Sequence, residues 1–139
     1  MAEPGTVAAV FLLRADGAAL LQHRDDLPTI NHPNRWVPPG GHCAPGESVE
    51  ACARREFFEE TDYRLGELRL LASFLDDDAG LRHAVRLTVF WSEYDGVQQP
   101  VCREGQAVRF VPRAEADALN VPAPLIDLWD SANSARRTG

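Results

Sequence analysis

Three glutamates with helical spacing constrain this chain more than any other feature of its sequence. The segment Ser48–Thr61 has the pattern of a helix and contains Glu56, Glu59 and Glu60. At about 100° per residue, positions i, i+3 and i+4 lie within an arc of about 100°, so the three carboxylates share one face. Like charges this close repel each other, and the repulsion grows in a partly dry cleft. Arg55 alone cannot neutralise three carboxylates, so the pattern asks for a further cation.

A hard divalent cation would offset this repulsion. Mg²⁺ prefers oxygen ligands and keeps several of its waters. Gly40 and Gly41 precede the helix, and glycine allows backbone conformations in which a carbonyl turns toward an ion. Taken alone, however, an E-x-x-E-E pattern more often marks a solvated acidic helix face. A solvated face is therefore the alternative to a metal site.

Charge and composition exclude several classes of function. The chain has 14 basic and 21 acidic residues and a net charge of −7, so we expect no binding to a nucleic-acid polymer. All 14 basic residues are arginine, which excludes Walker-type NTPases and Schiff-base enzymes because both need lysine. The longest apolar run, Val7–Leu13, is far shorter than the roughly 20 residues of a membrane span. With no secretory signal either, the sequence predicts a cytoplasmic protein without a membrane anchor.

The cysteines predict reduced thiols. Cys43, Cys52 and Cys102 are odd in number and contain no C-x-x-C pair, which argues against a disulfide framework and a zinc ribbon. We therefore expect all three to be small, buried or half-buried thiols.

The patterning predicts an α+β fold in which helices pack on a mixed sheet. Strands are expected at Thr6–Leu13, Ala18–His23, Glu67–Leu75, His83–Tyr94 and Ala107–Val111. Helices are expected at Ser48–Thr61 with Ser48 as N-cap, at Pro112–Leu119 with Pro in the first position, and at Pro124–Asn133 before a frayed tail. The remaining expectations are a hairpin around Ala15–Gly17, a long functional loop at Arg24–Arg35, irregular backbone at Pro38–Gly41, an acidic turn at Asp76–Gly80 and a loop at Val97–Gly105.

The segment Gly41–Tyr63 resembles the box of the Nudix family, G-x5-E-x7-R-E-U-x-E-E-x-G-U, in which U is a bulky apolar residue. The residues that match at the required spacing are Gly41, Glu47, Arg55, Glu56, Glu59 and Glu60, with Phe57 and Tyr63 at bulky positions. Asp62 departs from the pattern, because the family has Gly there. This position lies just past the helix end, where a left-handed residue is favoured, and Asp tolerates that conformation better than most residues. We interpret Asp62 as a structural substitution, with a fourth metal-facing carboxylate as the alternative.

The resemblance implies one Nudix domain over residues 1–139, with a mixed sheet sandwiched between helices. It implies a MutT-like pyrophosphatase activity, in which Mg²⁺ or Mn²⁺ assists water attack on a diphosphate linkage of a small nucleotide, either a nucleoside triphosphate or a nucleoside diphosphate linked to another group. The metal ligands that it implies are the Gly41 carbonyl and the carboxylates of Glu56, Glu59 and Glu60.

The other roles are distributed over the box and two loops. Glu56 is the candidate general base, with Glu104 as a second candidate, and Arg55 orients the carboxylates. We expect Arg24 and Arg35 to bind substrate phosphate, and Glu47 to support the loop on the substrate side. Solvated charges are the alternative for both arginines and for Glu104.

Two other functions are compatible with the resemblance. One is a non-catalytic nucleotide-binding module with the Nudix fold. The other is an isoprenoid diphosphate isomerase, which shares the fold and uses Cys and Glu in proton transfer. Cys43 lies near the box, but the intact set of glutamates speaks against the isomerase. The family also leaves a homodimer open, and the sequence does not select one nucleotide substrate.

Overall fold

The computed structural model of the protein describes residues 5–76 and 84–138. The predicted acidic turn at Asp76–Gly80 lies outside the described residues except for Asp76, and so does His83 at the start of a predicted strand.

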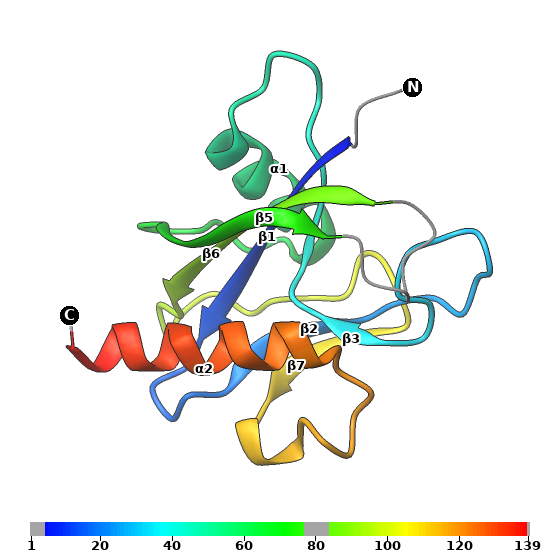
Figure 1. Ribbon diagram of the computed structural model, residues 1–139. Helices are drawn as coiled ribbons and strands as arrows, with labels where there is room; N and C mark the ends of the chain where they lie inside the picture. Colours follow the sequence, from blue (N-terminus) through cyan, green and yellow to red (C-terminus); the bar gives the residue numbers. More distant parts are fainter. Residues whose placement is uncertain (1–4, 77–83, 139) are drawn as a thin grey trace.

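A mixed β-sheet forms the middle layer, with one long helix on each face (Figure 1). The strands are β1 (Gly5–Leu13), β2 (Ala19–His23), β3 (Trp36–Val37), β4 (Gly40–His42), β5 (Arg69–Asp76), β6 (Val85–Glu93) and β7 (Ala107–Val111). The helices are α1 (Val49–Thr61) and α2 (Ala123–Thr138), with a short 3-10 helix, η1 (Arg113–Glu115), before α2. This arrangement confirms the predicted α+β class and the sheet between helices.

Strand β1 is the centre of the sheet because its apolar run buries both faces. It pairs in parallel with β6 along its whole length and antiparallel with β4 near its start. Successive side chains of a strand point to opposite faces. Val10 therefore packs in the α1 layer and Phe11 in the α2 layer, and both are fully buried. One strand thus joins the two cores.

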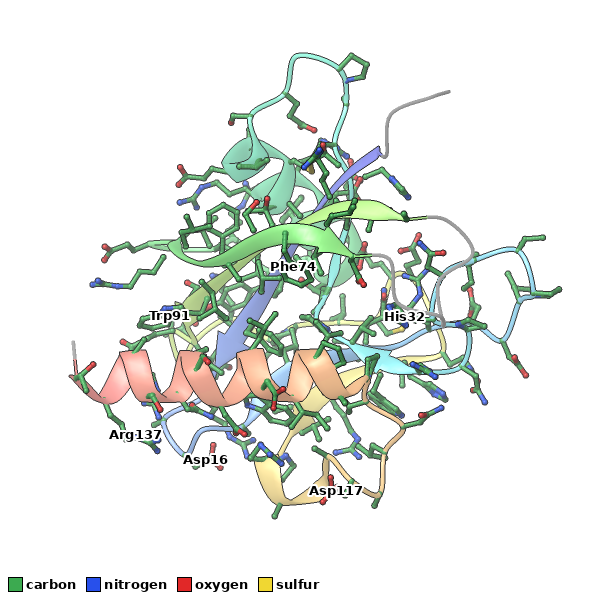
Figure 2. The ribbon with its side chains drawn as sticks, viewed as in Figure 1. Asp16, His32, Phe74, Trp91, Asp117 and Arg137 are labelled. Atoms are coloured by element: carbon green, nitrogen blue, oxygen red, sulfur yellow. A yellow bond between two sulfur atoms is a disulfide. The ribbon has the colours of Figure 1, made fainter. Side chains whose placement is uncertain are left out.

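Helix α2 is anchored to the turn between β1 and β2. Trp129 is fully buried, packs on Phe11 and donates from Nε1 to the Gly17 carbonyl at 2.9 Å. Asn133 donates to the same carbonyl at 3.1 Å. Trp91 belongs to this core, on the side of the sheet that α2 covers (Figure 2). The helix therefore seals the face opposite α1.

Several predicted details are confirmed. The Ser48 hydroxyl accepts a hydrogen bond from the Ala51 N–H at 3.1 Å and caps α1 as expected. Asp62 has a φ of 61°, which is the left-handed conformation expected after the helix. Strand β7 has the predicted bounds, and residues 24–35 contain no helix or strand.

The predicted hairpin and the irregular backbone at Pro38–Gly41 were wrong in part. Strand β2 leaves β1 after one pair, Leu13↔Ala19, and then pairs with β7, because β4 occupies that edge of β1 further along. Gly40 and Gly41 are extended residues of β4 rather than an irregular segment. A Cβ atom at Gly40 would lie 2.7 Å from the Ala9 Cα, so the close pairing requires glycine.

The C-terminal elements also differ from the prediction. Helix α2 runs to Thr138 instead of ending at Asn133, because Ala135 packs on the core and Arg136 donates to the Ala15 carbonyl at 3.2 Å. Pro112 precedes the three-residue η1 as its N-cap, where the sequence predicted a longer helix. No helix in residues 5–76 or 84–138 is both long enough and apolar enough to cross a membrane.

Replacing Trp129 by Ala is expected to lower the free energy of unfolding by about 3–5 kcal/mol, because it opens a cavity between α2 and the sheet. Ser131→Ala, on the exposed side of the same helix, should change it by less than about 0.5 kcal/mol. Urea unfolding followed by circular dichroism measures both. Equal midpoints for the two variants would contradict the anchoring role of Trp129.

Candidate active site

Arg55 on α1 is the centre of an ion-pair network. Its Nε and Nη2 atoms donate to the two carboxylate oxygens of Glu47, each at 2.8 Å. Its Nη1 atom donates to Glu56 Oε1 at 2.9 Å and to Glu59 Oε2 at 3.3 Å, while Nη2 also donates to the His42 carbonyl at 3.2 Å. The bonds to Glu47 and Glu56 raise the pKa of Arg55 above its ordinary value, so its charge is permanent.

Glu47 connects this network to the loop between β4 and α1. The bidentate bond from Arg55, helped by the Ala44 N–H at 3.0 Å, lowers the pKa of Glu47 to about 2. A carboxylate held in this way stays ionised at any pH at which the protein would work. Glu47 therefore fixes the loop that leads from the two glycines to the helix.

Glu60 lies deeper than the other carboxylates of the helix. It is 2% exposed, and its Oε2 accepts a hydrogen bond from Gln22 Nε2 at 2.9 Å. Its Oε1 accepts no hydrogen bond within the described part of the chain. Burial, followed by the charges of Glu104 and Glu56, raises the pKa of Glu60 to about 9, while the Gly40 N–H acts in the opposite direction.

The loop at residues 97–105 brings Glu104 to this buried group. The N–H groups of Val101 and Arg103 donate to the Thr61 and Glu60 carbonyls at 2.9 Å, so the loop is bound to the end of α1. The carboxyl of Glu104 lies within hydrogen-bonding reach of Glu60. Two carboxyls share a hydrogen bond only while one of them carries a proton. A cation between them would replace that proton.

Asp62, which replaces the glycine of the Nudix pattern, makes two contacts at the end of α1. Asp62 Oδ1 pairs with Arg103 Nη2 at 3.0 Å, and the Asp62 N–H donates to the Phe58 carbonyl at 2.8 Å. Both contacts are structural, in agreement with the interpretation of Asp62 as a structural substitution. The alternative, a fourth carboxylate facing the metal, has no support in these contacts.

Gly41 lies directly against Glu56. A side chain at position 41 would collide with the Glu56 carboxylate, and Oε2 is the oxygen that it would meet first. The opposite oxygen, Oε1, is bound by Arg55. The carboxylate of Glu56 therefore lies between the guanidinium and the β4 backbone, with its side chain 18% exposed.

The carboxylates at this end of α1 are the type of ligand that suits a hard divalent cation, but they do not converge on one point. No three His, Cys, Asp or Glu side chains among residues 5–76 and 84–138 form a group that would hold an ion as they stand. Arg55 binds Glu56 and Glu59, whereas Gln22 binds Glu60. A buried carboxylate oxygen without a donor is nevertheless the feature expected of an unfilled ligand.

Comparison with known proteins shows to which family the chain belongs. The NUDIX domain matches residues 3–129, which is most of the chain. The protein is a member of the Nudix family. The residues that match the Nudix box are those of the network around Arg55 and Glu60, so the resemblance noted in the sequence is confirmed at the level of the family.

Relatives with solved structures share the Nudix fold over nearly the whole chain. The MutT protein from Methanosarcina mazei Go1 is 19% identical, with a TM-score of 0.77 and 98% of each chain covered. The NUDIX domain of Shewanella oneidensis NrtR, solved as a complex with ADP ribose, is 16% identical, with a TM-score of 0.82 and coverage of 98% of this chain and 90% of that one. At these identities the likeness establishes the fold alone.

A curated relative is similar over a shorter segment. The m7GpppN-mRNA hydrolase NUDT17 from Bos taurus is 42% identical over 57 residues, or 41% of this chain. This chain spans only 18% of that protein.

The two arginines predicted to bind phosphate lie at the two ends of the loop at residues 24–35, and Arg24 lines a cavity. Arg24 lines a cavity of about 120 Å³ next to Gly40 and Gly41, together with Asn31 and His32 of the same loop. Its Nε donates to the Asn31 carbonyl at 2.8 Å. Figure 2 shows His32 within this loop, at the end of the sheet near β3. Among the described residues Arg35 is not part of that lining.

Trp36 borders this region from β3. The Trp36 ring stacks on the His23 ring with 4.7 Å between the ring centres, and the Arg109 guanidinium lies 5.2 Å from the centre of the Trp36 ring. Trp36 also packs against the core of the α2 layer. These contacts give Trp36 a packing role.

Two features of the site were missed from the sequence. Gln22 is 1% exposed and binds Glu60, and a glutamine within an otherwise apolar strand is the signal that would have shown it.

The expectation of three buried or half-buried thiols was wrong. Cys43 and Cys52 form a disulfide with a Cα–Cα distance of 5.2 Å, and Cys102 is an exposed thiol. The packing of α1 against β4 brings the pair together, which no sequence spacing reveals.

Reduction of the Cys43–Cys52 disulfide is expected to lower the free energy of unfolding by about 2–3 kcal/mol, the value for a short closed loop. Urea unfolding with and without a thiol reductant measures the loss, and Cys102→Ser should show the same loss as the wild type. Thiol alkylation followed by mass measurement should modify one cysteine before reduction and three afterwards. Three modified cysteines in the unreduced folded protein would contradict the disulfide.

The raised pKa of Glu60 predicts how the stability of the metal-free protein depends on pH. Above the ordinary pKa of about 4.5 the unfolded chain releases the Glu60 proton, whereas the folded protein keeps it up to about pH 9. The contribution of Glu60 to stability is therefore present at low pH and is lost as the pH rises through this window. Glu60→Gln removes the loss, so in EDTA the variant should be stabler than wild type at pH 8 by on the order of a few kcal/mol.

The same comparison at pH 4 is the control, because both side chains are then neutral. Glu50→Gln, an exposed residue of the same helix, should not stabilise the protein at pH 8. Identical unfolding curves for wild type and Glu60→Gln at pH 8 would show that the carboxyl is not held in its neutral form.

Proposed function

We propose that this protein hydrolyses a diphosphate linkage of a small nucleotide with the help of Mg²⁺ or Mn²⁺. The substrate class is a nucleoside triphosphate, or a nucleoside diphosphate linked to another group, and the nucleophile is water that attacks phosphorus. The observation that carries this proposal is the buried Glu60 carboxyl, whose Oε1 accepts no hydrogen bond in the described part of the chain and faces the charges of Glu104 and Glu56.

The proposed ligands are the Gly41 carbonyl and the carboxylates of Glu56, Glu59 and Glu60. A bound divalent ion supplies charge neutralisation for the diphosphate and lowers the pKa of a water. Glu60 is the preformed ligand, since Gln22 already holds one of its oxygens. Glu56 and Glu59 reach an ion by giving up their bonds to Arg55 Nη1, while the bidentate bond to Glu47 through the other two nitrogens keeps the guanidinium in place.

Glu56 is our first choice for the general base that takes a proton from water. Its Oε1 accepts a hydrogen bond from Arg55, and its Oε2 lies on the side of Gly41. Glu104 is the second candidate, because its exposed loop position beside Glu60 allows it to reach substrate and solvent. The base would have to lie within hydrogen-bonding distance, about 3 Å, of the water that attacks.

The substrate side of the proposal rests on the cavity beside Gly40 and Gly41. Its walls are largely apolar, with residues from β1, β4 and β6, and Arg24 is part of the lining. An apolar pocket next to a phosphate-binding centre suits a nucleoside. The ADP ribose in the NrtR domain supports a nucleotide, as does the hydrolase name of the curated relative. Arg35 is proposed as a further phosphate contact from the same loop.

A nucleotide-binding module without hydrolysis is the second candidate. It is favoured by the bonds of Arg55 to Glu56 and Glu59, which occupy two of the proposed ligands. The structure gives no support to the isomerase, since the Cys43 sulfur is part of a disulfide.

The cytoplasmic location and the homodimer stay predictions. In the cytoplasm the disulfide would have to resist a reducing environment.

Glu60→Gln is expected to lower turnover by about 100-fold or more while leaving the fold intact, because an amide is a poor ligand for a hard cation. The assay is a panel of nucleoside triphosphates, ADP ribose, nucleotide sugars and dinucleoside polyphosphates, run with Mg²⁺ and with Mn²⁺ and scored for released phosphate, pyrophosphate or nucleotide. Glu50→Gln is the matched control and should retain wild-type turnover, since it pairs only with Arg54 on the helix surface.

Undiminished turnover in Glu60→Gln would contradict the proposed hydrolysis mechanism. Tight nucleotide binding by the wild type without product over a long incubation would instead support the binding module.

A further inference from the structure

Gln22 is the polar residue of β2 that lies inside the protein. It is 1% exposed, and its neighbours Leu20 and Leu21 are buried apolar residues. Burying an amide among apolar side chains costs free energy unless its hydrogen bonds are made. The protein therefore gains something from the amide that an apolar residue of the same size would not give.

Both hydrogens of the Gln22 amide are donated to the candidate active site. Nε2 donates to Glu60 Oε2 at 2.9 Å and to the Glu104 carbonyl at 3.1 Å. The orientation of the amide follows from the Glu104 carbonyl, because a backbone carbonyl only accepts hydrogen bonds. Gln22 thus connects the buried carboxylate of α1 to the loop at residues 97–105.

The loop approaches β2 closely at this point. A Cβ atom at Gly105 would lie 2.7 Å from the His23 carbonyl oxygen and 3.1 Å from Gln22 Cγ, so only glycine fits with its φ of +86°. The Gln106 N–H donates to the same carbonyl at 2.7 Å. The loop residue Glu104 is therefore held in place immediately beside the Gln22 amide.

We propose that Gln22 is a positioning residue for metal binding: it holds Glu60 by one oxygen so that the other oxygen is left for the ion, and it keeps Glu104 beside it. This inference rests on the proposed function. Without the amide, the Glu60 carboxyl loses the side-chain donor that fixes the position of Oε2. The ion would then have to order the carboxyl as it binds, which weakens binding.

The test uses Gln22→Met, which keeps the length of the side chain and removes the donors. Mn²⁺ titration of the intact protein, followed by electron paramagnetic resonance of the free ion, measures the dissociation constant without any substrate. We expect binding to be about 10–100-fold weaker in the variant. Gln98→Met is the control and should bind Mn²⁺ like the wild type. Gln98 bonds to Arg64, Asp95 and Tyr94, and none of its hydrogen bonds within the described residues goes to Glu60 or Glu104.

Activity gives a second readout that a purely structural defect would not move. If Gln22 acts through the ion, raising Mg²⁺ restores most of the turnover of Gln22→Met, and the apparent Mg²⁺ requirement rises by the same factor as the Mn²⁺ dissociation constant. A dissociation constant within twofold of wild type in the folded variant overturns the inference and leaves the proposed hydrolysis standing. Wild-type protein that binds no Mn²⁺ overturns both.

A measurement on the wild type covers the case in which Gln22→Met does not fold. In ¹⁵N-labelled protein, Mn²⁺ should broaden the side-chain NH₂ signals of Gln22 at low ion concentration, and those of Gln98, which is bonded to Arg64 and not to Glu60, should be broadened less. An unchanged Gln22 signal at saturating Mn²⁺ overturns the inference.

Discussion

Negative charge packed against a sheet has to be compensated, and in this protein Arg55 provides most of the compensation. One guanidinium bonds to Glu47 with two nitrogens and to Glu56 and Glu59 with the third. It thereby joins the loop after β4 to the helix and keeps two carboxylates from repelling each other. Glu60 is beyond its reach and depends on burial and on Gln22. The site is divided into a charged outer part and a neutral inner part, and an ion would bridge the two.

The sheet makes this division possible because β1 has two buried faces. On one face it supports α1 and the box, and on the other it supports α2, which is held by Trp129. The carboxylates therefore stand on a helix that cannot shift without disturbing the central strand. The loops at residues 24–35 and 97–105 lie at the margins of this rigid frame, where changes in sequence disturb the fold less than changes in the core.

Local signals in the sequence predicted much of this structure. Helix α1 with its Ser48 cap, the left-handed Asp62 and strand β7 followed from spacing and residue type, since each depends on neighbours along the chain. The disulfide, the donors of Gln22 and the pairing of β2 with β7 depend on segments far apart in sequence. The end of α2 was missed for the same reason, because its last turn is stabilised by the Ala15 carbonyl. Spacing thus predicted the residues of the candidate site but not the partners that they have in the structure.

The disulfide between Cys43 and Cys52 has a consequence for the box itself. The two cysteines are nine positions apart, so the segment between them, which carries Glu47 and the cap of α1, is a closed covalent ring. A protease that cuts this ring once would leave the two pieces of the chain joined through the disulfide until a reductant was added, so Glu47 would stay attached to both pieces through this bond. The disulfide therefore does not prevent cleavage of this exposed stretch of the box, but it keeps the cleaved stretch attached to the protein.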